Sequence, residues 1–127
     1  MDGPASALEI EVSSDDPSGA ANVMVDGELD VSNVDRLYEC VRKLIREGQS
    51  NIVLNLRRLR YMDSTGMAIL VAARKRAADV GGQFRVEVQP NSIVARLLEI
   101  SGLLRILTED PQAATATATA KKKPLTE

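Results

Sequence analysis

The chain has 127 residues with 16 basic and 18 acidic side chains, which gives a formal net charge of −2. This length suits one domain, and a hydrophobic content of 44 % can supply its core. The absence of histidine and the single cysteine, Cys40, exclude disulfide frameworks, His/Cys zinc sites and imidazole-based catalytic triads. The slight acidic excess and the scarcity of aromatic residues argue against direct binding of nucleic acid.

Local sequence patterns argue against a membrane protein, an exported protein and a nucleotide-binding protein. The longest apolar run, residues 67–73, is far shorter than a membrane span, and the N-terminal MDGP lacks the basic start of an export signal. We therefore expect a cytoplasmic protein with no membrane attachment. The phosphate-binding pattern GxxxxGK[ST] does not occur, and we expect neither a cofactor nor a metal site.

The first half of the chain contains two predicted strands and one helix. Apolar and acidic side chains alternate over residues 8–13, which predicts a half-buried strand. A turn at 15–19 and a second strand at 22–25, running into GELD at 27–30, predict a hairpin. Ser32 and Asp35 have the spacing of a capping-box helix start, and a helical apolar stripe then runs to Gly48.

The second half alternates strands and helices. Residues 52–56 predict a central strand covered on both faces, 57–62 a basic connection, and 63–80 a helix ended by two glycines. A strand over 83–89 precedes a helix that Pro90, Asn91 and Ser92 cap and Gly102 ends. The apolar side of this helix is predicted to comprise Ile93, Val94, Leu97, Leu98 and Ile100. A short last strand is expected around residues 105–107.

This order of elements predicts an α/β fold in which helices cover a mixed central β-sheet and crossovers are right-handed. The domain is expected to span residues 8–108, after a flexible N-terminus at 1–7. Residues 109–127 are rich in alanine, threonine and lysine and have little large apolar surface, so we expect a disordered tail.

The strongest candidate for function is DSTG at 63–66, where a central strand and its connection give way to a helix. Ligands and partners usually meet an α/β sheet at this side. Helix capping alone also explains Asp63, Ser64 and Thr65, since their oxygens accept the free amides of a first turn. An aspartic protease would need a second copy of the motif, which the chain lacks.

The helix after this motif is unusual in its composition. Residues 67–73, MAILVAA, are apolar all round, whereas a helix packed on a sheet needs only one apolar stripe. The surplus predicts a docking surface for another protein, with Met67 and Ala68 nearest to Ser64. A more deeply buried helix explains the same pattern.

Three separated segments resemble one family. NLRRLRYMDSTGMAIL at 55–70, GELD at 27–30 and VARLLEISGL at 94–103 are similar to the signature of STAS domains, specifically bacterial anti-sigma factor antagonists. The resemblance covers about residues 8–108 and implies a single STAS-like domain. It implies that an anti-sigma factor, itself a serine kinase, phosphorylates Ser64, with Thr65 as the alternative. The unphosphorylated protein would bind this partner and free a sigma factor, and a Ser/Thr phosphatase would reset the switch.

The resemblance also suggests which residues contact the partner. The predicted partner-binding residues are Asp30, Asp63, Ser64, Thr65, Gly66, Met67 and Ala68. Asp30 is included because the resemblance brings its loop near the serine, and its carboxylate is also a candidate turn acceptor. Asp63 is hypothesised to position the hydroxyl, with simple capping as the alternative. Ala68 replaces a second glycine of many members, and the Ala/Thr-rich tail replaces their amphipathic last helix.

The leading hypothesis is therefore a regulatory binding protein, not an enzyme, that is a monomer or weak dimer. A STAS scaffold subunit of a stress-signalling assembly would instead form a large particle. A third hypothesis is an accessory STAS domain for a small ligand or for lipid transport. Cys40 is expected to be an unreactive structural thiol.

Overall fold

The structure is a computed structural model that describes residues 7–14 and 16–108. The predicted tail at 109–127 and residues 1–6 of the predicted N-terminal segment lie outside the described residues. The elements are β1 (Leu8–Ser13), β2 (Ala21–Leu29), α1 (Val34–Arg46), β3 (Ile52–Met62), α2 (Ser64–Asp79), β4 (Phe84–Glu87), α3 (Ile93–Ile100) and α4 (Leu104–Thr108). No helix in this part of the chain is long and apolar enough to cross a membrane.

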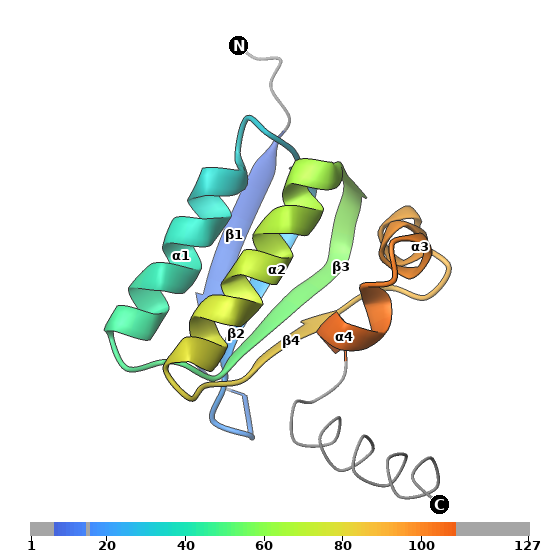
Figure 1. The fold of residues 1–127 in the computed structure, drawn as a ribbon. Helices are drawn as coiled ribbons and strands as arrows, with labels where there is room; N and C mark the ends of the chain where they lie inside the picture. The colour runs from blue at the N-terminus through green and yellow to red at the C-terminus, as the bar shows by residue number, and fades with distance from the viewer. Residues whose placement is uncertain (1–6, 15, 109–127) are drawn as a thin grey trace, which may run out of the picture.

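The four strands form one mixed sheet in the order β1-β2-β3-β4. β1 pairs antiparallel with β2, and β2, β3 and β4 are parallel, which confirms the predicted hairpin and mixed sheet. Figure 1 shows α1 and α2 side by side across one face, with α3 and α4 beyond β3 and β4. The core fills the space between these helices and the sheet, and its largest fully buried side chains include Phe84, Leu37, Leu54 and Leu70.

β3 is longer than predicted. The run 52–56 does lie between two strands, but the expected connection at 57–62 continues the same strand. Two register shifts against β2 insert extra residues in β3, so the two-residue alternation breaks around Arg57 and Arg60. This irregularity hides the strand in the sequence. Because β3 reaches Met62, its end is aligned with Leu29 at the end of β2.

The start of α1 differs from the predicted capping box. The helix begins at Val34 after the N-cap Asn33, whose side chain makes no cap hydrogen bond. Asn33 Nδ2 instead donates to the Glu28 carbonyl at 2.9 Å, and Asn33 Oδ1 accepts from the Asp30 amide at 2.9 Å. Ser32 bonds to the Asp30 carboxylate, so it is not available as the cap.

The C-terminal elements bring three corrections. The predicted strand at 105–107 is helix α4, in which Leu107 is fully buried, and β4 covers only the centre of the predicted 83–89. Ile93 and Ile100 were expected on the apolar side of α3 but are 56 % and 78 % exposed. The predicted Ser92 cap is confirmed, since its hydroxyl accepts from the Ala95 amide at 3.1 Å.

Candidate functional site

Two aspartates follow the carboxyl ends of neighbouring parallel strands. Leu29 of β2 is the register partner of Met62 of β3, so Asp30 and Asp63 each follow directly after neighbouring strand ends. The Asp63 amide donates to the Leu29 carbonyl at 3.2 Å, which joins the two chain segments at this point. The fold therefore brings GELD and DSTG together although more than thirty residues separate them.

Asp63 is the N-cap of α2. Its backbone is extended, with φ −99° and ψ −174°, and its Oδ1 accepts from the Gly66 amide at 2.9 Å. The Asp63 carbonyl accepts from the Met67 amide at 3.1 Å. The bond to Gly66 satisfies an amide that the helix start leaves without an intrahelical acceptor, and the bond from Met67 is the first i to i−4 bond of the helix. Capping is thus observed, and a further role in positioning the hydroxyl of the neighbouring serine stays a hypothesis.

Gly66 allows the first turn of α2 to pack closely on the sheet. It is buried, and a Cβ atom at this position would lie 2.6 Å from Met62 Cγ and 3.2 Å from Leu29 Cδ2. The lack of a side chain therefore lets the first turn of α2 approach the ends of both β2 and β3. This close approach holds the start of α2 against the strands.

Ser64 is the first residue of α2, and it is exposed. Ala68 is exposed four residues later, on the same side of the helix. Thr65 is half-buried, and Met67 is half-buried and packs against the core. Of the predicted site residues on α2, Ser64 and Ala68 thus face solvent, whereas Gly66 and Met67 support the helix.

The apolar side chains of α2 are partly buried in the core and partly exposed. Leu70, Ala73 and Ala77 are buried, and Ile69 packs partly buried against the core, so the helix is more covered than a surface helix. Val71, however, is 43 % exposed. The deeper burial of the helix is therefore confirmed in part, the exposed apolar area is small, and the docking surface stays a prediction.

The loop between β2 and α1 is held by hydrogen bonds. Asp30 Oδ1 accepts from the Ser32 amide at 2.9 Å and from the Ser32 hydroxyl at 2.6 Å, which confirms Asp30 as a turn acceptor. The Asp30 carbonyl accepts from the Asn33 and Val34 amides. The adjacent Val31 is 73 % exposed. Neither Asn33 nor Val31 was among the predicted site residues, and the only signal for Val31 was one valine within a polar turn.

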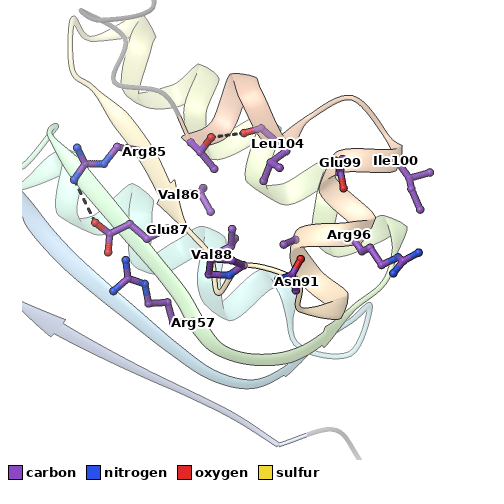
Figure 2. Close-up of a pocket in the computed structure, with 13 residues that line it drawn as sticks. Arg57, Arg85, Val86, Glu87, Val88, Asn91, Arg96, Glu99, Ile100 and Leu104 are labelled. Atoms are coloured by element: carbon purple, nitrogen blue, oxygen red, sulfur yellow. Dashed lines mark hydrogen bonds and ion pairs between the residues drawn. The ribbon is translucent and has the colours of Figure 1, made fainter.

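A cavity lies away from these residues. It has a volume of about 920 Å³ and lies beside β4, α3 and α4 (Figure 2). Its walls combine arginine and apolar side chains, among them Arg57, Arg85, Val88, Arg96 and Leu104. Arg85 forms an ion pair with Glu87 at 3.4 Å. No predicted site residue lines this cavity.

One titratable group near the core has a shifted pKa. Burial raises the pKa of the Cys40 thiol, and the nearby Lys43 lowers it less strongly. Over residues 7–14 and 16–108, no group of three or more histidine, cysteine, aspartate or glutamate side chains could hold a metal ion.

The sequence model of the STAS domain matches residues 11–118. The chain belongs to the STAS domain family. It is 31 % identical over 101 residues to the anti-sigma F factor antagonist of Paenibacillus polymyxa, covering 79 % of this chain and 86 % of that one. It is 36 % identical over 81 residues to the anti-sigma-B factor antagonist of Staphylococcus aureus, covering 64 % and 74 %.

Solved structures show the same STAS fold. An anti-sigma factor antagonist from Mycobacterium paratuberculosis has a TM-score of 0.69 at 21 % identity, with 91 % of this chain and 95 % of that chain covered. The phosphorylated form of the Bacillus cell fate determinant SpoIIAA has a TM-score of 0.58 at 22 % identity, with 87 % and 99 % covered. The predicted single STAS-like α/β domain is confirmed.

Proposed function

We propose that this STAS protein is an anti-sigma factor antagonist. In the unphosphorylated form it binds an anti-sigma factor that is also a serine kinase, and thereby frees a sigma factor for transcription. Phosphorylation of Ser64 switches this binding off, and a Ser/Thr phosphatase restores it. The observation that carries the proposal is the exposed Ser64 hydroxyl at the start of α2, in a domain whose curated relatives are named antagonists.

The proposed contact surface, called the switch face, comprises Asp30, Val31, Asp63, Ser64, Thr65, Ala68 and Val71. It combines two carboxylates and two hydroxyls with the exposed apolar side chains of Val31 and Val71. Such a mixture suits a protein partner, because apolar contacts provide affinity while polar groups set orientation. Gly66 and Met67 contribute by holding α2 against the strands.

A phosphoryl group at Ser64 changes this surface without opposing the fold. It adds about −1.5 to −2 charges, which the amides and dipole of a helix N-terminus accommodate. The same charge stands beside Asp63 and near the end of β2 that bears Asp30. Burying it against an apolar or acidic partner costs ~3 kcal/mol or more. This penalty weakens binding by on the order of a hundredfold.

Three substitutions test the switch. Ser64→Ala is expected to bind the anti-sigma kinase even in the presence of ATP, whereas Ser64→Glu is expected to bind weakly and keep the wild-type circular-dichroism spectrum. Ser14→Glu is the matched control, because Ser14 is an exposed serine that follows β1, outside the switch face. Calorimetric titration with the purified kinase gives the affinities. Equal affinity for all variants would reject the proposal.

The modified residue can be identified directly. The protein is incubated with ATP, Mg²⁺ and candidate anti-sigma kinases, and peptides containing residues 63–67 are fragmented in a mass spectrometer. A phosphoryl group on Ser64 supports the proposal. A phosphoryl group on the half-buried Thr65 would transfer the switch to the neighbouring hydroxyl, and absence of modification by every kinase that binds the protein would contradict the switch.

A small-ligand role is a second candidate, and the cavity of about 920 Å³ supports it. This volume lies within the range of small-molecule sites, about 300–1,000 Å³. Three arginines line the cavity against two glutamates, Glu87 and Glu99, and this excess of positive charge beside apolar side chains favours anionic ligands with an apolar part. A thermal-shift screen of nucleotides and fatty acids tests this role, and a hit should lose its shift in Arg57→Gln but keep it in Arg76→Gln, on α2.

A further inference from the structure

The second face of the sheet carries neither α1 nor α2. Along β2, Val23 and Val25 are fully buried, whereas the intervening Asn22, Met24 and Asp26 are half-exposed. Successive side chains of a strand point to opposite faces, so the half-exposed set points away from the helices. Figure 1 shows both helices on the other face. In the described part of the chain, most side chains of this face are partly or fully exposed, and Val53, which is 4 % exposed, is the exception; we call this face the open face.

Strand register determines which charges share the open face. Glu9 of β1 is paired with Asp26 of β2, which is paired with Arg58 of β3. Residues paired across neighbouring strands lie on the same face of a sheet. By the same register Glu11 is aligned with Met24, and Arg85 of β4 with Val53.

The charges on this face are segregated. The acidic half, on β1 and β2, comprises Glu9, Glu11, Asp26 and Glu28. The basic half, on β3 and β4, comprises Arg57, Arg58, Arg60 and Arg85, and it also contains one acidic side chain, Glu87, which is paired with Asn55 and forms an ion pair with Arg85. Arg60 reaches Asp26 at 3.4 Å, where the two halves meet. Figure 2 shows Arg57 and Arg85 on the same side of the sheet, with Glu87 between them.

The acidic half is hollowed rather than flat, and the hollow reaches Asn55 and Arg58 on β3. Two cavities of about 370 Å³ and 120 Å³ share Glu11 and Met24 as lining residues. The Met24 side chain is half-buried there, opposite Asn55 on β3. The centre of the face thus offers a recess and one flexible apolar side chain, which adapts to a facing surface.

We propose that the open face binds the open face of a second copy of this chain. A twofold axis parallel to the strands, between β2 and β3, turns the sheet over and exchanges its two sides. The acidic half of one copy then lies over the basic half of its partner, twice, so one surface is complementary to itself. A twofold axis across the strands would instead stack like charges.

This arrangement predicts the properties of the dimer. Met24 lies next to the axis, so it faces the same region of the partner. Because the face is mostly polar and its charges are solvent-exposed in the free chain, the dimer is weak and salt-sensitive. Raising the salt concentration from about 0.1 M to about 1 M shortens the Debye length from ~10 Å to ~3 Å and shifts the equilibrium toward monomer.

Complementary charge reversals test the proposal with the full chain. Variant A, Arg57→Glu with Arg58→Glu, makes the open face predominantly acidic although Arg60 and Arg85 remain, and variant B, Glu9→Lys with Glu11→Lys, makes it largely basic. Sedimentation velocity should show that self-association of each variant is weaker than wild type by about tenfold or more. A mixture of A and B should form heterodimers at least as tightly as wild type. The control Arg36→Glu with Arg76→Glu reverses exposed charges on α1 and α2 and should dimerise like wild type.

A cross-linking experiment tests the position of the axis. In a Cys40→Ala background, Met24→Cys should be cross-linked into a dimer by a bismaleimide that spans about 10 Å, the spacing of stacked sheets, whereas Ala78→Cys, exposed on α2, should not. Circular dichroism and thermal melts of every variant verify folding. A wild-type monomer at all concentrations in low salt, an A and B mixture that stays monomeric, or a species larger than a dimer would overturn the proposal. No measurement here involves an anti-sigma factor, so the outcome is independent of the proposed function.

Discussion

Substitution of Asp63 separates its capping role from a role in phosphorylation. In Asp63→Ala the Gly66 amide loses its acceptor at 2.9 Å. Loss of an N-cap side chain costs about 1 kcal/mol, with a range of about 0.5–2 kcal/mol. Gly66 is buried, so its unpaired amide moves the expected cost toward the upper part of this range. A loss of about 1–2 kcal/mol lowers the melting temperature of a domain this size by roughly 4–12 °C.

The matched variants are Asp63→Asn and Asp63→Ser, whose side chains also cap helices. They should retain most of the stability that Asp63→Ala loses, apart from about 0.3–1 kcal/mol of charge interaction with the helix dipole for a neutral cap. Urea unfolding followed by circular dichroism gives the free energies. If Asp63→Ala were as stable as wild type, the capping bond would contribute nothing and the reasoning from geometry would be refuted.

The same variants report on the hydroxyl of Ser64. If Asp63 only caps the helix, Asp63→Asn should be phosphorylated at the wild-type rate by the anti-sigma kinase. If its carboxylate positions the hydroxyl or accepts its proton, Asp63→Asn should be slow although it is stable. Initial rates of phosphoryl transfer at saturating ATP distinguish the two cases, because the folding free energies are already known.

Two further substitutions and one chemical reaction test the packing. Gly27→Ala should lower the free energy of unfolding in urea by about 1–3 kcal/mol. The φ of Gly27 is +120°, and a Cβ atom there would lie 2.1 Å from the Ala7 carbonyl oxygen. Wild-type stability of this variant would contradict the close approach of the two chain segments at the start of β1. Phe84→Ala should cost about 3–5 kcal/mol in the same assay, since Phe84 is 1 % exposed, and a cost below about 1 kcal/mol would argue against this core. The raised pKa of Cys40 means less thiolate at a given pH, so its reaction with a disulfide reagent at pH 8 should be slower than that of free cysteine and should accelerate on unfolding.

Elements with a regular period could be predicted from the sequence. The alternation in β1 and the apolar stripe of α1 each follow one packing face, so their positions are confirmed. The end of β3 could not be predicted, because its register shifts against β2 remove the period at Arg57 and Arg60. α4 was mistaken for a strand because five residues are too few to distinguish the two periods.

In the candidate site too, some features could be predicted from the sequence and others could not. DSTG could be found because oxygen-bearing residues are strongly preferred directly before a helix, and Asp63 forms the capping bond. The structural role of Gly66 depends on Met62 and Leu29, which belong to two different strands, and no local pattern contains that distance. Asn33 likewise makes its contact with the Glu28 carbonyl through tertiary folding of a loop.

The two proposed surfaces are compatible because they lie on different parts of the sheet. Ser64 begins α2, which packs on the helical face, whereas the charged halves occupy the opposite face. A dimer built on the open face would thus leave both copies of Ser64 accessible to a kinase. The open-face charges also lie outside the switch face, so the proposed phosphorylation of Ser64 would place no charge in the proposed dimer interface. One small domain can therefore carry a phosphorylation-controlled contact and a salt-controlled contact without one interfering with the other.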